Sequence, residues 1–517
     1  MWIDNKRNLE FYIIETIRKI DKLDNYINEL LSKHYPTGTP SSFLLLIKKS
    51  ATFIKSDIVK ILTIIQNFSE GYEIIHYHRQ ILGLEEMIKM LWSHLKFVDG
   101  AQTHKVPWSI VPSIEKLLQD ITNDPGKKIL FRPQWNYNFS VQPQDIIGHY
   151  KRIFIDRLTK LDFGHTAEEI EEKIFKRIKE RENYENDSDW IGRSLYIFSF
   201  PGIDKRNIIM HCIIGHEMGH LILDELLKNE YFNVRSEQLK KYIIPVWRKY
   251  HKDEYSLDLF DQNQMKDVSP ISMKYIMATF MNFMNEARLI WKKGLKELAS
   301  DYIGVLLFGP SFLFSLYFFG VKQNIDDIPK KETNYYPSRR LRLRLVYNYL
   351  VEKGFLYSSK IPLQLRSNFD NFIKSIKNTV YNKSDEKNIN EDDICSIVYN
   401  KLIFPQLKEL KTSIDGKIND YVLTEEILFK NIDKIIERIE NQIPPNAIEN
   451  AIDDHELCTI PLILNSSWIY NICYTGNVLV NGKINEDILH FKDLLDRITL
   501  KGIEFSFIEG EYNNYLN

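Results

Sequence analysis

The feature that most constrains the fold is a run of 19 residues without a charged side chain, IGVLLFGPSFLFSLYFFGV, from Ile303 to Val321. A membrane-spanning helix needs about 20 apolar residues, so this run approaches the length of a span. Gly309-Pro310 lies near its middle, however, and a proline interrupts a helix. The pattern therefore favours two buried helices joined at a Gly-Pro corner, and a single membrane span is the alternative.

Most of the remaining sequence has helical periodicity. Apolar residues recur every three or four positions from residue 8 to about 120, and again from about residue 272 onward. Two stretches are instead rich in aromatic and β-branched residues, Lys128–Val141 and Ser194–Phe200, and these predict strands. We therefore expect a mainly α protein with a small β-sheet, of the α+β class.

Breaks in these patterns suggest four parts along the chain. We expect a helical N-terminal domain, a central core with an insertion at about 229–270, a helical region and a small C-terminal helical subdomain. Their expected bounds are 1–125, 126–355, 356–445 and 446–517.

Composition excludes some partners and indicates a compartment. The chain carries 68 Lys and Arg against 70 Asp and Glu, so its formal charge of −2 predicts no nucleic-acid partner. The four cysteines show no CxxC spacing and fit reduced, buried thiols. The N-terminus, MWIDNKRNLEFYIIE, has no signal-peptide core. We expect a cytoplasmic protein.

The stretch HCIIGHEMGHLILDE, residues 211–225, contains one HExxH motif. On a helix, His216 and His220 lie one turn apart on the same face and can bind one metal ion. Glu217 lies beside that pair, where it can take a proton from a water molecule on the metal. The structural alternative is a buried helix whose histidines bond to backbone carbonyls.

A second pair of residues four apart, Glu297 and Asp301, occurs in the predicted helix KELASDYIGVLLF. HExxH followed by ExxxD resembles zinc peptidases of the gluzincin class, and it implies a zincin-like core in which Glu297 is the third zinc ligand. The resemblance also implies that Asp301 orients a ligand histidine. Metzincins are excluded, because they need Gly and His where this chain has Leu223 and Leu226.

Two other acids compete for these roles. Glu286 precedes Glu297 on the same predicted helix, but Ile290 stands where a supporting acid would follow it. Asp224 lies on the HExxH helix itself, so it cannot easily complete a tetrahedron and is a candidate for orienting a ligand. The wide gap between His220 and Glu297 requires the 229–270 insertion to loop out.

The next segment, NYYPSRRLR, extends the resemblance. The CAAX prenyl protease and heat-shock membrane peptidase relatives follow ExxxD with a His-Pro pair and, several residues later, an arginine. This segment is similar, because Pro337 and Arg342 keep that spacing. Tyr336 replaces the histidine and could donate to the oxyanion of the reaction. The alternative is a basic amphipathic helix, RRLRLRLVYNYL, packed through its leucines. HExGH, ExxxD and Gly-Pro together also resemble uncharacterised bacterial proteins.

These patterns predict a zinc-dependent metallopeptidase that hydrolyses peptide bonds. The expected zinc ligands are His216, His220 and Glu297. The expected catalytic residues are Glu217, Tyr336 and Arg342, and Asp301 would orient a ligand histidine. The alternative is a helical binding or regulatory protein with a structural or vestigial zinc site. We expect a peptide or protein substrate and no membrane, and the helical flanks offer surfaces for a protein partner.

Ser194–Phe200 is either an edge strand that pairs with substrate or an internal strand.

Overall fold

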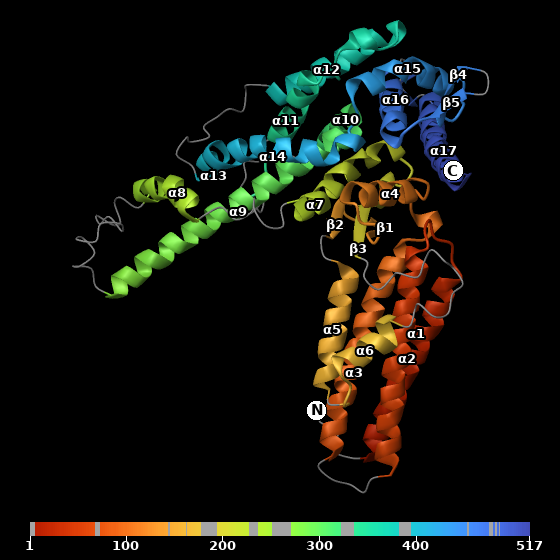
Figure 1. The fold of residues 1–517 in the computed structure, drawn as a ribbon, viewed down its shortest axis with the longest axis vertical. Coiled ribbons are helices and arrows are strands. Elements are labelled where there is room, and N and C mark those ends of the chain that lie inside the picture. The colour runs from red at the N-terminus through yellow and green to blue at the C-terminus, as the bar shows by residue number, and fades with distance from the viewer. Residues whose placement is uncertain are drawn as a thin grey trace. The chain divides into compact units, whose positions relative to one another are not determined.

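The computed structural model describes most of the chain. The described residues are 6–67, 73–142, 145–161, 163–176, 194–226, 236–250, 270–321, 335–381, 394–451, 454–474, 479–480, 483–484 and 486–516. They are mainly helical with small sheets, which confirms the expected fold class (Figure 1). Most of the expected insertion at 229–270 lies outside them, apart from one helix, α8 (Ser236–Tyr250).

The chain forms two compact units, Met1–Arg206 and Asn207–Asn517. The boundary falls inside the region 126–355, which the sequence suggested as one core. Residues of the small sheet, including Leu130 and Leu195, belong to the same apolar core as the N-terminal helices. Packing of this sheet on those helices therefore places residues 126–206 in the first unit.

The first unit is built around three long helices. Buried apolar residues recur every three or four positions in α1, from Leu9 and Ile13 to Ile27 and Leu30. This spacing gives each helix one apolar face, and these faces pack together. The helices of the unit are α1 (Lys6–Leu31), α2 (Thr39–Gln66), α3 (Glu73–Gly100), α4 (Ile110–Thr122), α5 (Ile146–Lys160) and α6 (Ala167–Ile170).

A three-stranded sheet completes the first unit, with strand order β1-β3-β2. The central strand β3 (Leu195–Pro201) pairs in parallel with β1 (Lys128–Gln134) and antiparallel with β2 (Ser140–Gln142). Both sides of β3 are thus occupied. Of the two alternatives for residues 194–200, the structure supports the internal strand, and the edge strand open to substrate is wrong.

The second unit carries the HExxH motif, and its described residues are almost entirely helical. A short 3₁₀ segment, Ile208–Ile213, leads into α7 (Ile214–Leu226). Besides α8, the helices described in this unit are α9 (Pro270–Phe308), α10 (Pro310–Val321), α11 (Arg339–Glu352), α12 (Arg366–Tyr381), α13 (Ile394–Val398), α14 (Phe404–Ile418), α15 (Glu425–Glu440), α16 (Ile460–Cys473) and α17 (Glu486–Leu516). Two hairpins pair β4 (Ala447–Ala451) with β5 (Asp454–Leu457) and β6 (Leu479–Val480) with β7 (Lys483–Ile484). The last 72 residues, 446–517, thus begin with a hairpin and belong to this unit.

The uncharged run 303–321 forms the expected corner. Helix α9 ends at Phe308, and α10 begins at Pro310. Gly309 between them has a φ of 56°, a conformation that side chains disfavour, and a Cβ there would lie 2.8 Å from Leu423. None of the helices in the described part of the chain combines the length and apolar character of a membrane span.

Candidate metal centre

The HExxH helix α7 packs directly against α9. Two glycines face the partner helix: a Cβ on Gly215 would lie 2.6 Å from the ring of Phe308, and a Cβ on Gly219 would lie 2.8 Å from the Cα of Ser300. Backbone thus approaches backbone at Gly219, one residue before His220. This close approach brings the predicted metal ligands of the two helices within reach of one another.

Replacing Gly219 should disturb both packing and the metal centre. We expect Gly219→Ala to destabilise the protein by about 1–3 kcal/mol, because the new methyl group must push the backbone at Ser300 away. The same shift moves α7 from α9, so metal affinity should fall as well. Urea unfolding and metal titration measure the two effects, and full retention of both would show that the interface tolerates a side chain.

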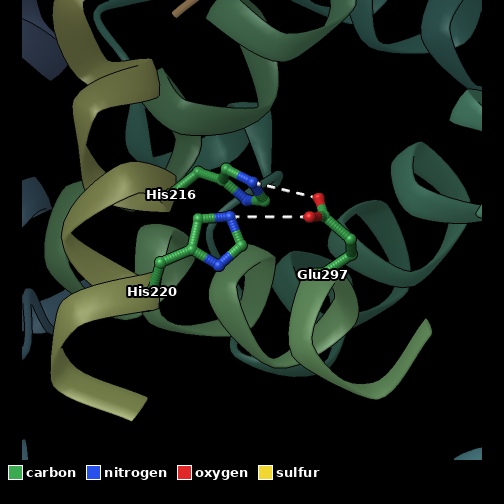
Figure 2. Close-up of side chains that lie close together, drawn as sticks. All are labelled: His216, His220 and Glu297. Carbon is green, nitrogen blue, oxygen red and sulfur yellow. Dashed lines mark ion pairs between the residues drawn. The ribbon is translucent and has the colours of Figure 1, made fainter. Parts of the chain in front are cut away.

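Three side chains from these helices converge (Figure 2). His216 and His220 project from α7 toward Glu297 on α9. The Nε2 atom of His216 lies 3.2 Å from Oε2 of Glu297, and that of His220 lies 3.5 Å from Oε1. Ligands at about 2.0–2.2 Å from a tetrahedral zinc ion are about 3.3–3.6 Å apart, and both separations are close to this range, each to a different oxygen of Glu297. One ligand atom from each residue lies within 4.8 Å of the others, and this buried group could hold a metal ion.

Each histidine is supported through its other ring nitrogen. Nδ1 of His216 lies 2.9 Å from Oδ1 of Asp301, and Nδ1 of His220 lies 2.9 Å from Oγ of Ser300. These contacts orient both rings so that the Nε2 atoms face Glu297, which is how metal-ligating histidines are usually held.

Sequence reasoning did not identify Ser300. The sequence did carry a signal for this residue. Ser300 is the third residue after Glu297 and directly precedes Asp301, and on a helix this spacing puts all three side chains on one face.

Arg342 lies behind the metal-binding residues. Its Nε and Nη2 atoms donate to the two oxygens of Asp301 at 2.7 and 2.6 Å, and its Nη1 atom lies 3.6 Å from Glu297. A paired, planar contact of this kind orients the carboxylate strongly. The structure thus places Arg342 on Asp301, where it can hold the acid that supports His216.

The charges of this cluster shift several pKa values. Burial alone disfavours a charged His216, as does Arg342, but Asp301 and Glu297 outweigh both and raise its pKa to about 9. Burial and His216 lower the pKa of His220 to about 3. Burial would raise the pKa of Glu297, yet its contacts with His216, Arg342 and His220 lower it to about 2. Without metal at neutral pH, the His216 ring is therefore positively charged, with Glu297 at one nitrogen and Asp301 at the other.

Metal binding should displace a proton from His216. At pH values below its pKa of about 9, the metal-free His216 is mostly protonated and must lose a proton to become a ligand, whereas His220 and Glu297 are already in their ligand forms at neutral pH. We expect the apparent metal affinity to rise about tenfold per pH unit between about pH 6 and 8 and to level off above about 9. Competition with a chelator of known protonation, measured across this range, tests the slope. A flat profile would contradict a charged His216.

The other two predicted catalytic residues are Glu217 and Tyr336, and Tyr336 lies near enough to Glu297 and Glu217 for their charges to act on it. Glu217 follows His216 on α7 and is 7% exposed. Tyr336 precedes α11 and is 43% exposed. Burial and the negative charges of Glu297 and Glu217 raise the pKa of Tyr336, so its hydroxyl keeps its proton at neutral pH. The Nζ atom of Lys293 lies 4.7 Å from the centre of the Tyr336 ring.

The two competing acids have other partners. Glu286 accepts a hydrogen bond from the hydroxyl of Tyr335 at 2.7 Å. Asp224 binds Nζ of Lys296 at 2.8 and 3.0 Å, so this lysine, rather than a ligand histidine, is its partner. Within the described part of the chain, the metal-binding group of acids and histidines includes neither of them.

Comparison with known proteins gives no relative. No protein-family model, curated protein or solved structure matches this chain. The resemblance to gluzincins therefore remains a prediction from the motifs.

The four cysteines, Cys212, Cys395, Cys458 and Cys473, are buried and form no disulfide, as expected from their spacing.

Proposed function

We propose that this protein is a zinc-dependent peptidase. The observation that supports it is the convergence of His216, His220 and Glu297, with a buried glutamate, Glu217, next to the first histidine. Two imidazoles and one carboxylate form a donor set of the catalytic zinc type, which leaves a fourth position open. A site that only stabilises the fold is usually closed by four protein ligands.

The side chains around the ligands suit hydrolysis of a peptide bond. A zinc ion held there would act as a Lewis acid and lower the pKa of a water molecule. Glu217 is the general base that takes the proton from the attacking water and passes it to the leaving amine. Tyr336, protonated and partly exposed, donates a hydrogen bond to the developing oxyanion. Arg342 holds Asp301, and Asp301 in turn holds His216.

A measurement of metal content together with peptide hydrolysis tests this proposal. We expect about one zinc ion per chain and cleavage of members of a broad peptide library, both removed by a strong chelator and restored by zinc. Zinc binding without any cleavage would favour the alternative, a binding or regulatory protein with a structural site. Absence of zinc binding would overturn the peptidase and the structural zinc site, and would leave only a binding or regulatory protein with a vestigial site.

A further inference from the structure

Helix α16 lies in the interior of the second unit and carries an unusual set of polar residues. Asn465, Ser466, Ser467 and Trp468 are each at most 2% exposed. Burying polar groups is costly unless they form hydrogen bonds, so the partners of Asn465, Ser467 and Trp468 show what the helix binds. Two of these residues bind segments that lead directly to the metal centre.

Asn465 binds the corner at the end of α9, the helix that carries Glu297. Its Nδ2 atom donates to the carbonyl oxygen of Phe308 at 2.8 Å, and its Oδ1 atom accepts from the backbone N–H of Ser311 at 2.7 Å. These two backbone groups lie on either side of Gly309-Pro310. One side chain therefore fixes the end of α9 and the start of α10.

Trp468 binds the segment that leads into α7, the helix that carries both histidines. Its indole N–H donates to the carbonyl oxygen of Ile209 at 2.7 Å, and the hydroxyl of Ser315 donates to the same oxygen at 3.0 Å. Ile209 belongs to the 3₁₀ segment that runs directly into α7. Asn465 and Trp468 are three residues apart, so they lie on one face of α16.

We propose that Asn465 and Trp468 are positioning residues of the metal centre. Helix α16 binds the segment that leads into α7 through Trp468 and the end of α9 through Asn465. Together these contacts limit how far α7 can slide along α9, the two helices that carry the predicted metal ligands. The tolerance is small, because zinc–ligand distances must hold to within about 0.2 Å. This inference rests on the metal site of the proposed function but does not depend on hydrolysis.

Two substitutions test the proposal, and a third is their control. Trp468→Phe keeps the ring and removes the N–H donor, and Asn465→Ala removes both bonds at the corner. Ser467→Ala lies on the same helix, is equally buried and removes a hydrogen bond from Thr499 at 2.8 Å, which joins α16 to α17 instead. All three lose buried hydrogen bonds, but only the first two lose contact with the metal-bearing segments.

The readouts are zinc affinity by chelator competition, the absorption spectrum of the Co²⁺ form and the melting temperature of the metal-free protein. We expect Trp468→Phe and Asn465→Ala to lose about 10–100-fold in zinc affinity, as residues behind metal ligands commonly do, and to alter the Co²⁺ spectrum. Ser467→Ala should lower the melting temperature only. Wild-type affinity and spectrum in both test variants, or an equal loss of affinity in the control, would overturn the proposal. If the wild-type chain itself binds no zinc, the proposed function fails instead.

Discussion

Glu217→Gln should abolish most peptide hydrolysis while leaving zinc in place. Glutamine keeps the size of the side chain but cannot take a proton from the attacking water. General-base catalysis contributes about 10²–10⁴-fold, so we expect kcat to fall by that factor. The three metal-binding residues are unchanged, so the zinc content should remain about one ion per chain. Peptide hydrolysis and metal analysis on the same preparation check both results.

A matched variant separates loss of the base from general damage. Glu286 is a glutamate on α9 that accepts a hydrogen bond from Tyr335 and lies outside the metal-binding group. Glu286→Gln makes the same chemical change there, and glutamine can still accept that bond. We expect it to retain zinc and hydrolysis. If Glu217→Gln were as active as Glu286→Gln, Glu217 would not be the base.

Local patterns in the sequence predicted the residues that converge in the candidate metal centre because helix geometry is local. His216 and His220 on one helix, and Glu297 and Asp301 on another, are each four residues apart, and this spacing alone puts each pair on one face. The Gly309-Pro310 corner was predictable for a similar reason, since both residues act on the backbone beside them.

Contacts between distant segments could not be predicted in this way. No spacing rule shows that Trp468 binds the carbonyl of Ile209 or that Ser300 faces His220, because these contacts depend on how helices pack. The boundary between the two units likewise depends on contacts between distant segments. Strands 128–134 and 195–201 are separated in sequence, and their pairing and burial against the N-terminal helices are tertiary facts.

Glu297→Gln should remove the metal itself. The amide has no negative charge to offer a cation, and Glu297 is the only carboxylate of the three-residue group in the described part of the chain. Residues behind metal ligands typically contribute about 10–100-fold to affinity, so we expect a direct ligand to contribute more than that. Zinc titration by chelator competition measures the loss, and hydrolysis should disappear with the metal.

The loss of zinc affinity in Glu297→Gln can be compared with the smaller loss expected in Asp301→Asn. Asparagine can still accept a hydrogen bond from His216, but it loses the charge that pairs with Arg342 at 2.6 and 2.7 Å. Its zinc affinity should fall within about 10–100-fold, less than in Glu297→Gln. This order follows from the geometry, because Glu297 faces both Nε2 atoms, whereas Asp301 contacts only the far side of one ring. The reverse order would show that Asp301, rather than Glu297, is the third ligand.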